Sequence, residues 1–253
     1  GKTVMRWLLS LLLFFAAPLA ADEEIVLGLS QDAVAITATF EGSEILIFGA
    51  IRRVAPVPPG QLGILVTVAG PDLPVVVRRK ERRFGIWVNV DDVRIDAAPS
   101  FYAVATSGPL KKVLRPSEDL HNKITLSQVV REVGTNVLDS RSFSRALMRI
   151  RAGNDLYQVR ENTVDISRDT LFNTSIAMPA NIAEGFYVAR IFLTRDGNVI
   201  DSYTTSIPVK KVGLERWLYN LAHENALLYG LLSLVIAVGS GWLASAAFGL
   251  LRR

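Results

Sequence analysis

The sequence predicts a mainly β protein: immunoglobulin-like β-sandwich lobes with an inserted helical pair, followed by one C-terminal transmembrane helix. Three observations predict this class. Short runs rich in Val, Ile and aromatic residues recur about every ten residues over 22–115 and again over 156–212. Apolar residues at helical spacing separate these two regions, over 116–155. The segment 226–251 carries no charged residue, which is typical of a membrane span.

Residues 1–21 have the layout of a secretory signal peptide. Lys2 and Arg6 form a basic start, and the apolar stretch 7–17 that follows is too short to span a bilayer comfortably. Small residues and an acidic patch come next, so cleavage after Ala21 is expected. The chain is then exported from residue 22 onward.

Residues 22–115 are expected to form an antiparallel N-terminal β lobe, because no helix-length segment interrupts the strand-like runs. The sharpest polar feature of this lobe is a dense basic cluster. It consists of Arg78, Arg79, Lys80, Arg82 and Arg83. One interpretation is a surface that faces an anion or an anionic lipid. The preferred interpretation is a charged hairpin end that protects an exposed strand edge from aggregation.

Residues 116–155 change to helical spacing and are interpreted as a pair of helices laid against the β structure. In the second helix, Phe143, Leu147 and Ile150 recur three or four positions apart, so they share one face. Gly153 follows this pattern, and glycine is typical of a helix end.

Residues 156–212 return to strands and predict a second, immunoglobulin-like β lobe. Asp196 and Gly197 lie between two alternating apolar runs, which is the pattern of a hairpin with a tight turn. The sequence MPANIAEGFYVARIFL also has the proline, glycine and tyrosine placement that precedes a late strand of many immunoglobulin-like domains. That likeness concerns the fold alone.

Residues 213–225 predict an amphipathic juxtamembrane helix, because their apolar residues form one stripe and their charged residues lie largely away from it. Trp217 and Tyr219 are the expected anchors at the membrane interface, where aromatic residues gather. The alternative is that this segment simply extends the membrane helix.

Residues 226–251 would form a helix of about 39 Å, against about 30 Å of hydrocarbon, so they can cross a bilayer with some tilt. Small residues recur at every fourth position. They are Ser233, Ala237, Gly241, Ser245 and Gly249. A partner helix can approach such a face closely, and a second copy or a different protein both fit. Arg252 and Arg253 are expected to anchor the other end of the span at the membrane interface, and they predict a cytoplasmic C-terminus.

The basic excess of the chain is a signal of membrane topology. The chain has 28 Lys and Arg against 24 Asp and Glu, a formal net charge of +4. Four of the basic residues lie in the two terminal segments, which leaves 24 of each sign between them. A neutral exported part argues against a nucleic-acid partner. The chain has no cysteine, which excludes disulfides and thiolate metal sites.

Three stretches carry a family resemblance: ITATFEGSEILIFGAI, then GIWVNV followed by PSFYAVATSGPL, and the closing EGFYVARIFLTRDGNVI with the membrane segment. They resemble a transmembrane protein family of alphaproteobacteria, over most of the chain from about Ile25 onward. The resemblance implies a single-span protein of a Gram-negative inner membrane with its body in the periplasm. It implies more weakly a link with sulfite-exporter-type permeases, and it supplies no catalytic residues.

The residues themselves offer little chemistry. The two histidines, His121 and His223, lie far apart in the sequence, and no nucleophile, phosphate-loop, metal or dinucleotide motif is present. We therefore expect no cofactor and no enzymatic activity. The expected function is a membrane-anchored periplasmic accessory protein that contacts lipid and docks on an integral membrane partner. The alternative is a periplasmic binding module for a small anion or an envelope polymer.

Overall fold

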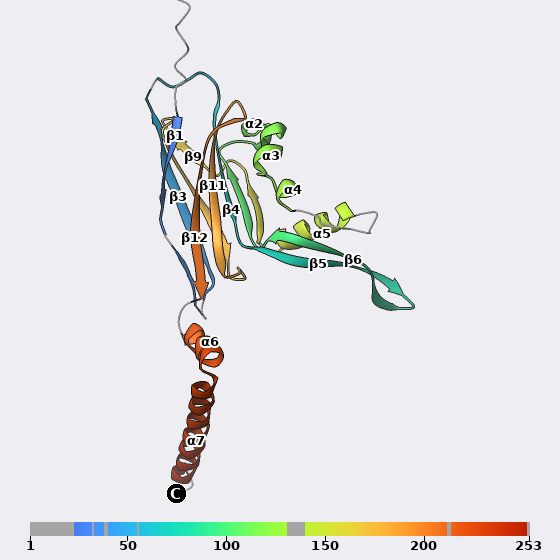
Figure 1. Ribbon diagram of the computed structural model, residues 1–253, viewed down its shortest axis with the longest axis vertical. Coiled ribbons are helices and arrows are strands. Elements are labelled where there is room, and N and C mark those ends of the chain that lie inside the picture. The colour runs from blue at the N-terminus through green and yellow to red at the C-terminus, as the bar shows by residue number, and fades with distance from the viewer. Residues whose placement is uncertain are drawn as a thin grey trace, which may run out of the picture.

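The computed structural model describes a β body, a hairpin arm that projects from it, and two helices that follow one end of the body (Figure 1). The described residues are 23–31, 33–37, 40–54, 56–130, 140–211 and 214–251. The predicted signal peptide lies outside them, as do Arg252 and Arg253.

Two sheets packed face to face form the β body. The four-stranded sheet has the order β1-β3-β10-β9, and the six-stranded sheet has the order β2-β12-β11-β4-β7-β8. The first sheet contains β1 (Glu23–Leu29), β3 (Gly42–Arg53), β10 (Leu171–Pro179) and β9 (Asp165–Ser167). The second contains β2 (Val34–Ile36), β12 (Asn198–Lys211), β11 (Gly185–Arg195), β4 (Leu62–Ala69), β7 (Tyr102–Thr106) and β8 (Tyr157–Arg160).

The hydrophobic core of the body lies between these sheets. Ile45 and Ile47 of β3 and Ile191 and Leu193 of β11 are fully buried in one cluster. In each pair the two residues are separated by one position, so their side chains point to the same face of the strand. Strands hold about half of the described residues, which confirms a mainly β protein.

The strands predicted to form two lobes, 22–115 and 156–212, instead share one body. β3 pairs with β10 in the first sheet, and β4 pairs with β11 in the second. The physical reason is that the apolar faces of the two sheets bury each other, and strands from both halves of the chain contribute to each face. The separation into lobes is therefore replaced by one common core.

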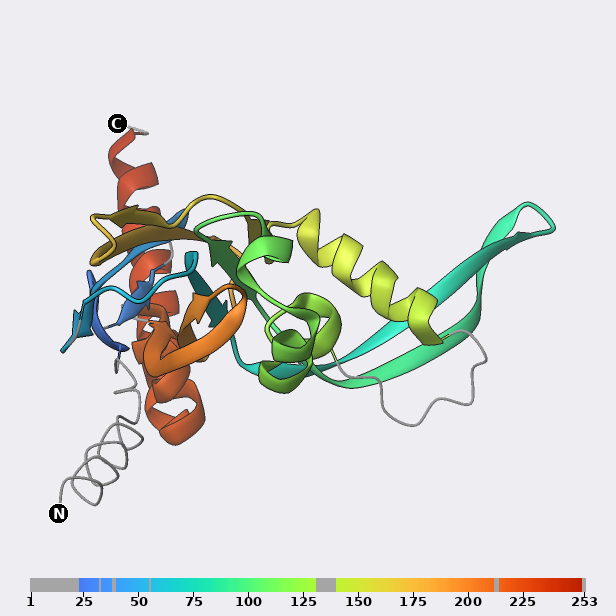
Figure 2. The same cartoon turned by 90° about the horizontal axis from the view of Figure 1, so that it is seen from above.

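The arm is the long connection between β4 and β7. It consists of β5 (Asp72–Arg83) and β6 (Ile86–Pro99), which pair only with each other in a two-stranded sheet. Backbone hydrogen bonds from Gly70 to Phe101 and from Ser100 to Pro71 close its base at 2.8 Å. Figure 2 shows the arm extending sideways from the body with one helix beside it.

The helical region contains more than the predicted pair. Its described helices are α2 (Leu110–Val113), α3 (Pro116–Asn122), α4 (Leu126–Val129) and α5 (Ser140–Ala152). The first predicted helix is divided because Lys123 adopts a left-handed conformation with φ 50° and ends α3. Asp119 stabilises this break, since its carboxylate accepts hydrogen bonds from the backbone N–H groups of Ile124 and Thr125. The second predicted helix is α5, and Phe143 and Leu147 of its apolar face are buried, whereas Ile150 is 54% exposed because it lies near the end of the helix at the open cavity beside β5.

Two helices follow β12. α6 (Leu214–Glu224) and α7 (Ala226–Leu251) are separated by the non-helical Asn225. They do not share an axis (Figure 1). The segment before α7 is therefore a separate helix and not a straight extension of it.

A buried ion cluster joins the two sheets at the end of the body opposite α6. The Glu23 carboxylate of β1 is 2% exposed and lies between Arg53 of β3 and Arg195 of β11, with Arg195 Nη2 2.7 Å from Glu23 Oε2. Burial alone would raise the pKa of Glu23, but hydrogen bonds from the two guanidinium groups bring it below the ordinary value of 4.5. Arg195 also donates to the backbone oxygens of Pro58 and Gly60, so the cluster holds the β3–β4 loop as well.

We predict that Glu23→Gln destabilises the protein by about 3–5 kcal/mol at neutral pH, because two buried arginines lose their only counter-charge in this cluster. Because the folded-state pKa is lowered, the stabilisation is fully present above pH 4.5 and is lost as the pH falls through the folded value. Thermal unfolding of the full chain in detergent between pH 3 and 7 would measure the difference between variant and wild type. That difference should shrink at acid pH.

The neighbouring Glu24→Gln is the matched control. Glu24 pairs with Arg52 on the surface, where the side chains are 55% and 67% exposed, so its loss should cost less than about 1 kcal/mol. Equal effects of the two substitutions at neutral pH would contradict the assignment.

Candidate functional site

The basic cluster of the sequence lies on β5 and is divided by the geometry of the arm. Arg78 and Arg79 lie opposite Asp92 and Asp91 on β6, in the half of the arm that contacts α5. The other three basic residues lie nearer the end of the hairpin, and Arg83 is opposite Ile86, beside the turn. The two parts of the cluster therefore face different surroundings.

Arg79 holds the arm against α5. Its guanidinium donates a hydrogen bond of 2.7 Å to Ser142 Oγ and lies 4.6 Å from the centre of the Phe143 ring. It also lies 3.6 Å from the Asp91 carboxylate. Phe143 and Leu147 complete this contact by packing in a buried cluster with Val77 of β5. The inward face of the arm is thus fixed to α5 by packing and by charge together.

An open cavity of about 560 Å³ lies between β5 and α5, and its lining is strongly basic. It contains Arg78 and Arg79 from the arm together with Arg145 and Arg149 from α5, and none of the described residues that line it is Asp or Glu. Two of these four arginines were not selected from the sequence. Their spacing of four positions places them on one helix face, but only the fold shows that this face meets the basic strand.

The end of the hairpin, which we call the tip and define as residues 80–90, exposes three large apolar side chains. Phe84 is 106% exposed, Ile86 65% and Trp87 67%. Register pairs Arg82 with Trp87 and Arg83 with Ile86, so each apolar residue of these pairs has a basic residue opposite it. A guanidinium beside an exposed aromatic or aliphatic side chain gives the tip an amphiphilic surface.

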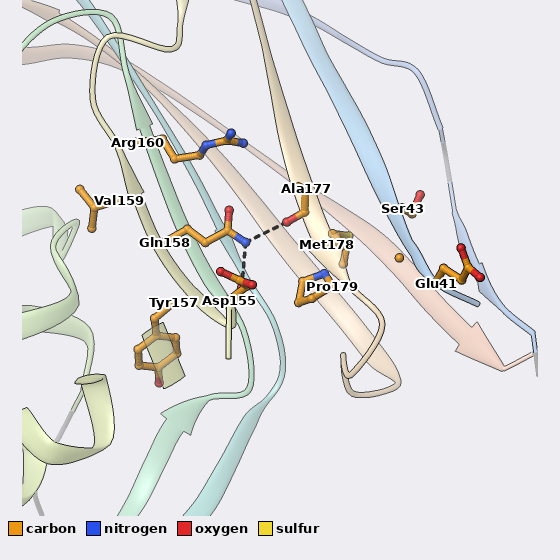
Figure 3. Close-up of a pocket in the computed structure, with 11 residues that line it drawn as sticks. Glu41, Ser43, Asp155, Tyr157, Gln158, Val159, Arg160, Ala177, Met178 and Pro179 are labelled. Carbon is orange, nitrogen blue, oxygen red and sulfur yellow. Dashed lines mark hydrogen bonds between the residues drawn. The ribbon is translucent and has the colours of Figure 1, made fainter. Parts of the chain in front are cut away.

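A second cavity, of about 610 Å³, lies between β8 of one sheet and the paired ends of β3 and β10 of the other. Gln158 spans part of it, with Nε2 2.8 Å from the Asp155 backbone oxygen and 3.0 Å from that of Ala177 (Figure 3). The hydroxyl of Tyr157 is buried and donates to the Pro99 oxygen, so it does not serve this cavity. Glu41 and Arg160 also line it, but among the described lining residues no nucleophile is hydrogen-bonded to a base.

The histidines are not brought together by the described fold. His121 lies exposed on α3. His223 stacks on Tyr219 of α6, with 4.0 Å between ring centres, and its Nδ1 lies 2.9 Å from the Tyr219 backbone oxygen. Within the described ranges, no three His, Asp or Glu residues are grouped so that they could hold a metal ion.

The predicted packing face lies on α7. A Cβ added at Gly241 would meet no other atom within 4 Å, and Ser245 is exposed. Ser233 donates its hydroxyl to the Tyr229 backbone oxygen at 2.9 Å, which satisfies that polar group within the helix. Gly249 belongs to α7 but lies beyond the residues whose surroundings are described.

The predicted interface residues Trp217 and Tyr219 lie on α6 and are 52% and 64% exposed. In the described part of the chain, one helix is long and apolar enough to cross a membrane. None of its apolar window, Ala226–Ser245, is buried against the rest of the protein, unlike the core helix of a globular domain. α7 therefore presents an apolar surface all round.

A family model described as "Putative transmembrane protein (Alph_Pro_TM)" matches residues 24–249. The chain belongs to this family. The match extends over the β body, the arm and most of α7, so all three are parts of one family unit. The comparison with curated proteins gives no match. For the Alph_Pro_TM chain described here, the arm, its contact with α5 and the face of α7 are the candidate functional surfaces.

We predict that Phe143→Ala releases the arm from α5. Loss of this buried ring leaves a cavity next to Val77 and removes the surface on which Arg79 lies, at a cost of about 3–5 kcal/mol. Hydrogen exchange of the full chain in detergent should show faster exchange in β5 and β6. The control Ile150→Ala alters a side chain on the same helix that is 54% exposed, and should change stability by less than about 0.5 kcal/mol. Unchanged exchange in both variants would refute this role of Phe143.

Proposed function

We propose that this protein is a non-enzymatic, membrane-anchored accessory protein that docks on an integral membrane partner through α7. The observation that carries the proposal is the unoccupied small-residue face of an uncharged helix that no part of the described β body covers. In lipid, helices associate by close packing and not by exclusion of water, so small residues mark where a partner backbone approaches.

The geometry of this face indicates how a partner would cross it. Residues four positions apart differ by about 40° around the helix axis, so the row from Ser233 to Ser245 winds slowly around α7. A partner helix that follows the row therefore crosses α7 at an angle, as in right-handed crossings of about −40°. Gly239 also has no atom within 4 Å of an added Cβ, but it lies about 200° around the helix from Gly241.

We place the protein in the inner membrane, with the β body in the periplasm and the C-terminus in the cytoplasm. The signal-like segment 1–21 and the terminal Arg252 and Arg253 support this orientation. α6 would lie at the membrane surface, with Trp217 and Tyr219 near the head groups. Family membership supports a membrane location, and the resemblance noted in the sequence supports an anion- or sulfite-exporter-type permease as the partner.

The β body is the part that would extend from such a complex. The Tyr187 hydroxyl donates to the backbone oxygen of Ala183 four residues earlier, at 2.8 Å. The tyrosine corner of immunoglobulin-like domains has the same hydrogen bond. It supports an immunoglobulin-like assignment for the body, and domains of that type bind partners through their edges and loops.

We predict that Gly241→Leu combined with Ser245→Leu lowers recovery of the membrane partner about tenfold after crosslinking in native membranes, equivalent to about 1.4 kcal/mol. Bulky side chains on this face would keep the partner backbone at a distance. Mass spectrometry of the crosslinked product would distinguish a different protein from a second copy.

Gly239→Leu is the control for the docking experiment, because two positions along a helix place it about 200° from Gly241. It adds the same side chain in equally open surroundings and should leave the recovered amount unchanged. Equal recovery with wild type, double variant and control would exclude this face as the docking surface.

The basic cavity favours a second candidate function, the binding of a small anion. Four arginines line one cavity in which no other described lining residue is charged, and the arginine fork suits oxyanions such as sulfite or sulfate. Ser142 of α5 adds a hydroxyl to the same lining. This function would not require a membrane partner.

We predict that sulfate or sulfite at 100 times its dissociation constant stabilises the full chain in detergent by about 2.7 kcal/mol, measured as an increase in melting temperature. Arg78→Gln with Arg145→Gln should abolish the shift. Arg82→Gln with Arg83→Gln removes the same charge outside the cavity lining and should preserve it. A shift of the same size with chloride at equal ionic strength would show general screening and contradict a specific site.

A further inference from the structure

We propose that the tip of the arm is a second membrane contact, which binds the anionic lipid surface of the leaflet from which α7 emerges. The proposal rests on α7 crossing the membrane, but it does not require a protein partner. Three features support it: the position of the arm, the distribution of charge along it, and the chemistry of its turn.

The arm and the membrane helix leave the body at the same end. β12 ends at Lys211, and Val209 near that end pairs with Gly185 of β11. A Cβ at Gly185 would lie 2.8 Å from Pro71 Cγ, so the residue just before the arm packs on the same point. β5 then begins at Asp72. The base of the arm therefore lies next to the strand end that leads into α6.

The arm reaches sideways from this end, beside the expected membrane surface. Its twelve-residue strand β5 is about 40 Å long at the usual rise of a strand. Figure 1 shows the arm sloping toward the level of α6, and Figure 2 shows its tip well away from the body. If α7 crosses a bilayer, the tip is held beside the leaflet on which the body stands.

Positive charge is concentrated where the arm would meet lipid. The tip has three basic residues, Lys80, Arg82 and Arg83, and one acidic residue, Glu81, a net charge of +2. The rest of the arm, 72–79 and 91–99, has three basic and four acidic residues, a net charge of −1. A hairpin that only needed charge for solubility would not require this separation. Basic groups at a membrane surface are attracted to anionic head groups.

The turn at the tip holds a large apolar side chain in a backbone conformation that disfavours it. Phe84 has φ 49° and Gly85 has φ 88°, as a two-residue hairpin turn with both central residues at positive φ requires. Asn or Asp tolerates the first of these positions better than a bulky residue. The fully exposed Phe84 gains no packing within the protein that would offset this strain. Its ring, with Ile86 and Trp87, forms an apolar end suited to the head-group boundary of a bilayer.

Trp87 itself is the probe for the test. The full chain has four tryptophans, so replacing the other three by Phe leaves emission from the tip alone. The protein is reconstituted in vesicles of phosphatidylcholine with or without phosphatidylglycerol. We expect a blue shift of Trp87 emission and quenching by brominated lipid when phosphatidylglycerol is present, and emission as in water without it. A separate variant that keeps only Trp242 of α7 reports whether the membrane helix is inserted.

Two sets of substitutions test the two parts of the contact. Arg82→Gln with Arg83→Gln should abolish the blue shift, whereas Lys111→Gln with Lys112→Gln, which removes two exposed charges on α2, should not. Phe84→Asn should reduce lipid quenching while leaving the hairpin at least as stable, because Asn-Gly is favoured in this turn. Loss of contact in that variant therefore cannot result from unfolding of the arm.

Water-like emission of Trp87 in phosphatidylglycerol vesicles, with Trp242 quenched by lipid, would overturn the proposal while leaving α7 as an anchor. Burial of Trp87 only in native membranes, and not in pure lipid, would assign the tip to a protein partner and also overturn it. Water-like emission of Trp242 would overturn both the membrane anchor and the second contact. An equal loss of the Trp87 blue shift in the Lys111 and Lys112 variant would show that the attraction to anionic lipid is not located at the tip.

Discussion

The position of β11 between β4 and β12 is the constraint on which the rest of the structure depends. Its pairing with β12 fixes where the chain leaves for α6, and its pairing with β4 fixes where the arm begins. Because both neighbours are antiparallel to β11, β4 and β12 run in the same direction, and they end near the start of β11, with Ala69 opposite Val188 and Val209 opposite Gly185. The central strand thus sets the positions of the two parts that project from the body.

The sequence predicted local properties better than long-range pairing. The mainly β class, the apolar face of α5 and the uncharged C-terminal helix follow from periodicity and composition, and all are present. The division into two lobes was wrong, because strand pairing joins residues more than a hundred positions apart, as between Ile45 and Ile176. The hydrophobic periodicity of one half of the chain does not show which strands of the other half will pair with its strands. The split of one predicted helix depended on Asp119, whose capping role appears only when Lys123 turns the chain.

The basic cluster shows the same limit for the candidate site. The sequence identified Arg78 to Arg83 as one feature, but the structure separates it into a part that contacts α5 and a part that does not. Arg145 and Arg149 join the first part only because α5 lies across the arm. The exposed Phe84, Ile86 and Trp87 appeared in the sequence as ordinary strand residues, since a hairpin end and a buried strand have similar composition. Solvent exposure, which decides between them, is a property of the fold.

The length of the arm relative to its point of attachment has a mechanical consequence. A body held by one helix can swivel about that helix and lean in any direction. The arm is about 40 Å long, so a small displacement of its tip along the membrane normal corresponds to only a small tilt angle of the body. Contact between the tip and lipid would therefore resist tilting of the body toward the arm. The opposite end, where Glu23 binds two arginines, would then be kept from tilting toward the bilayer on the side of the arm.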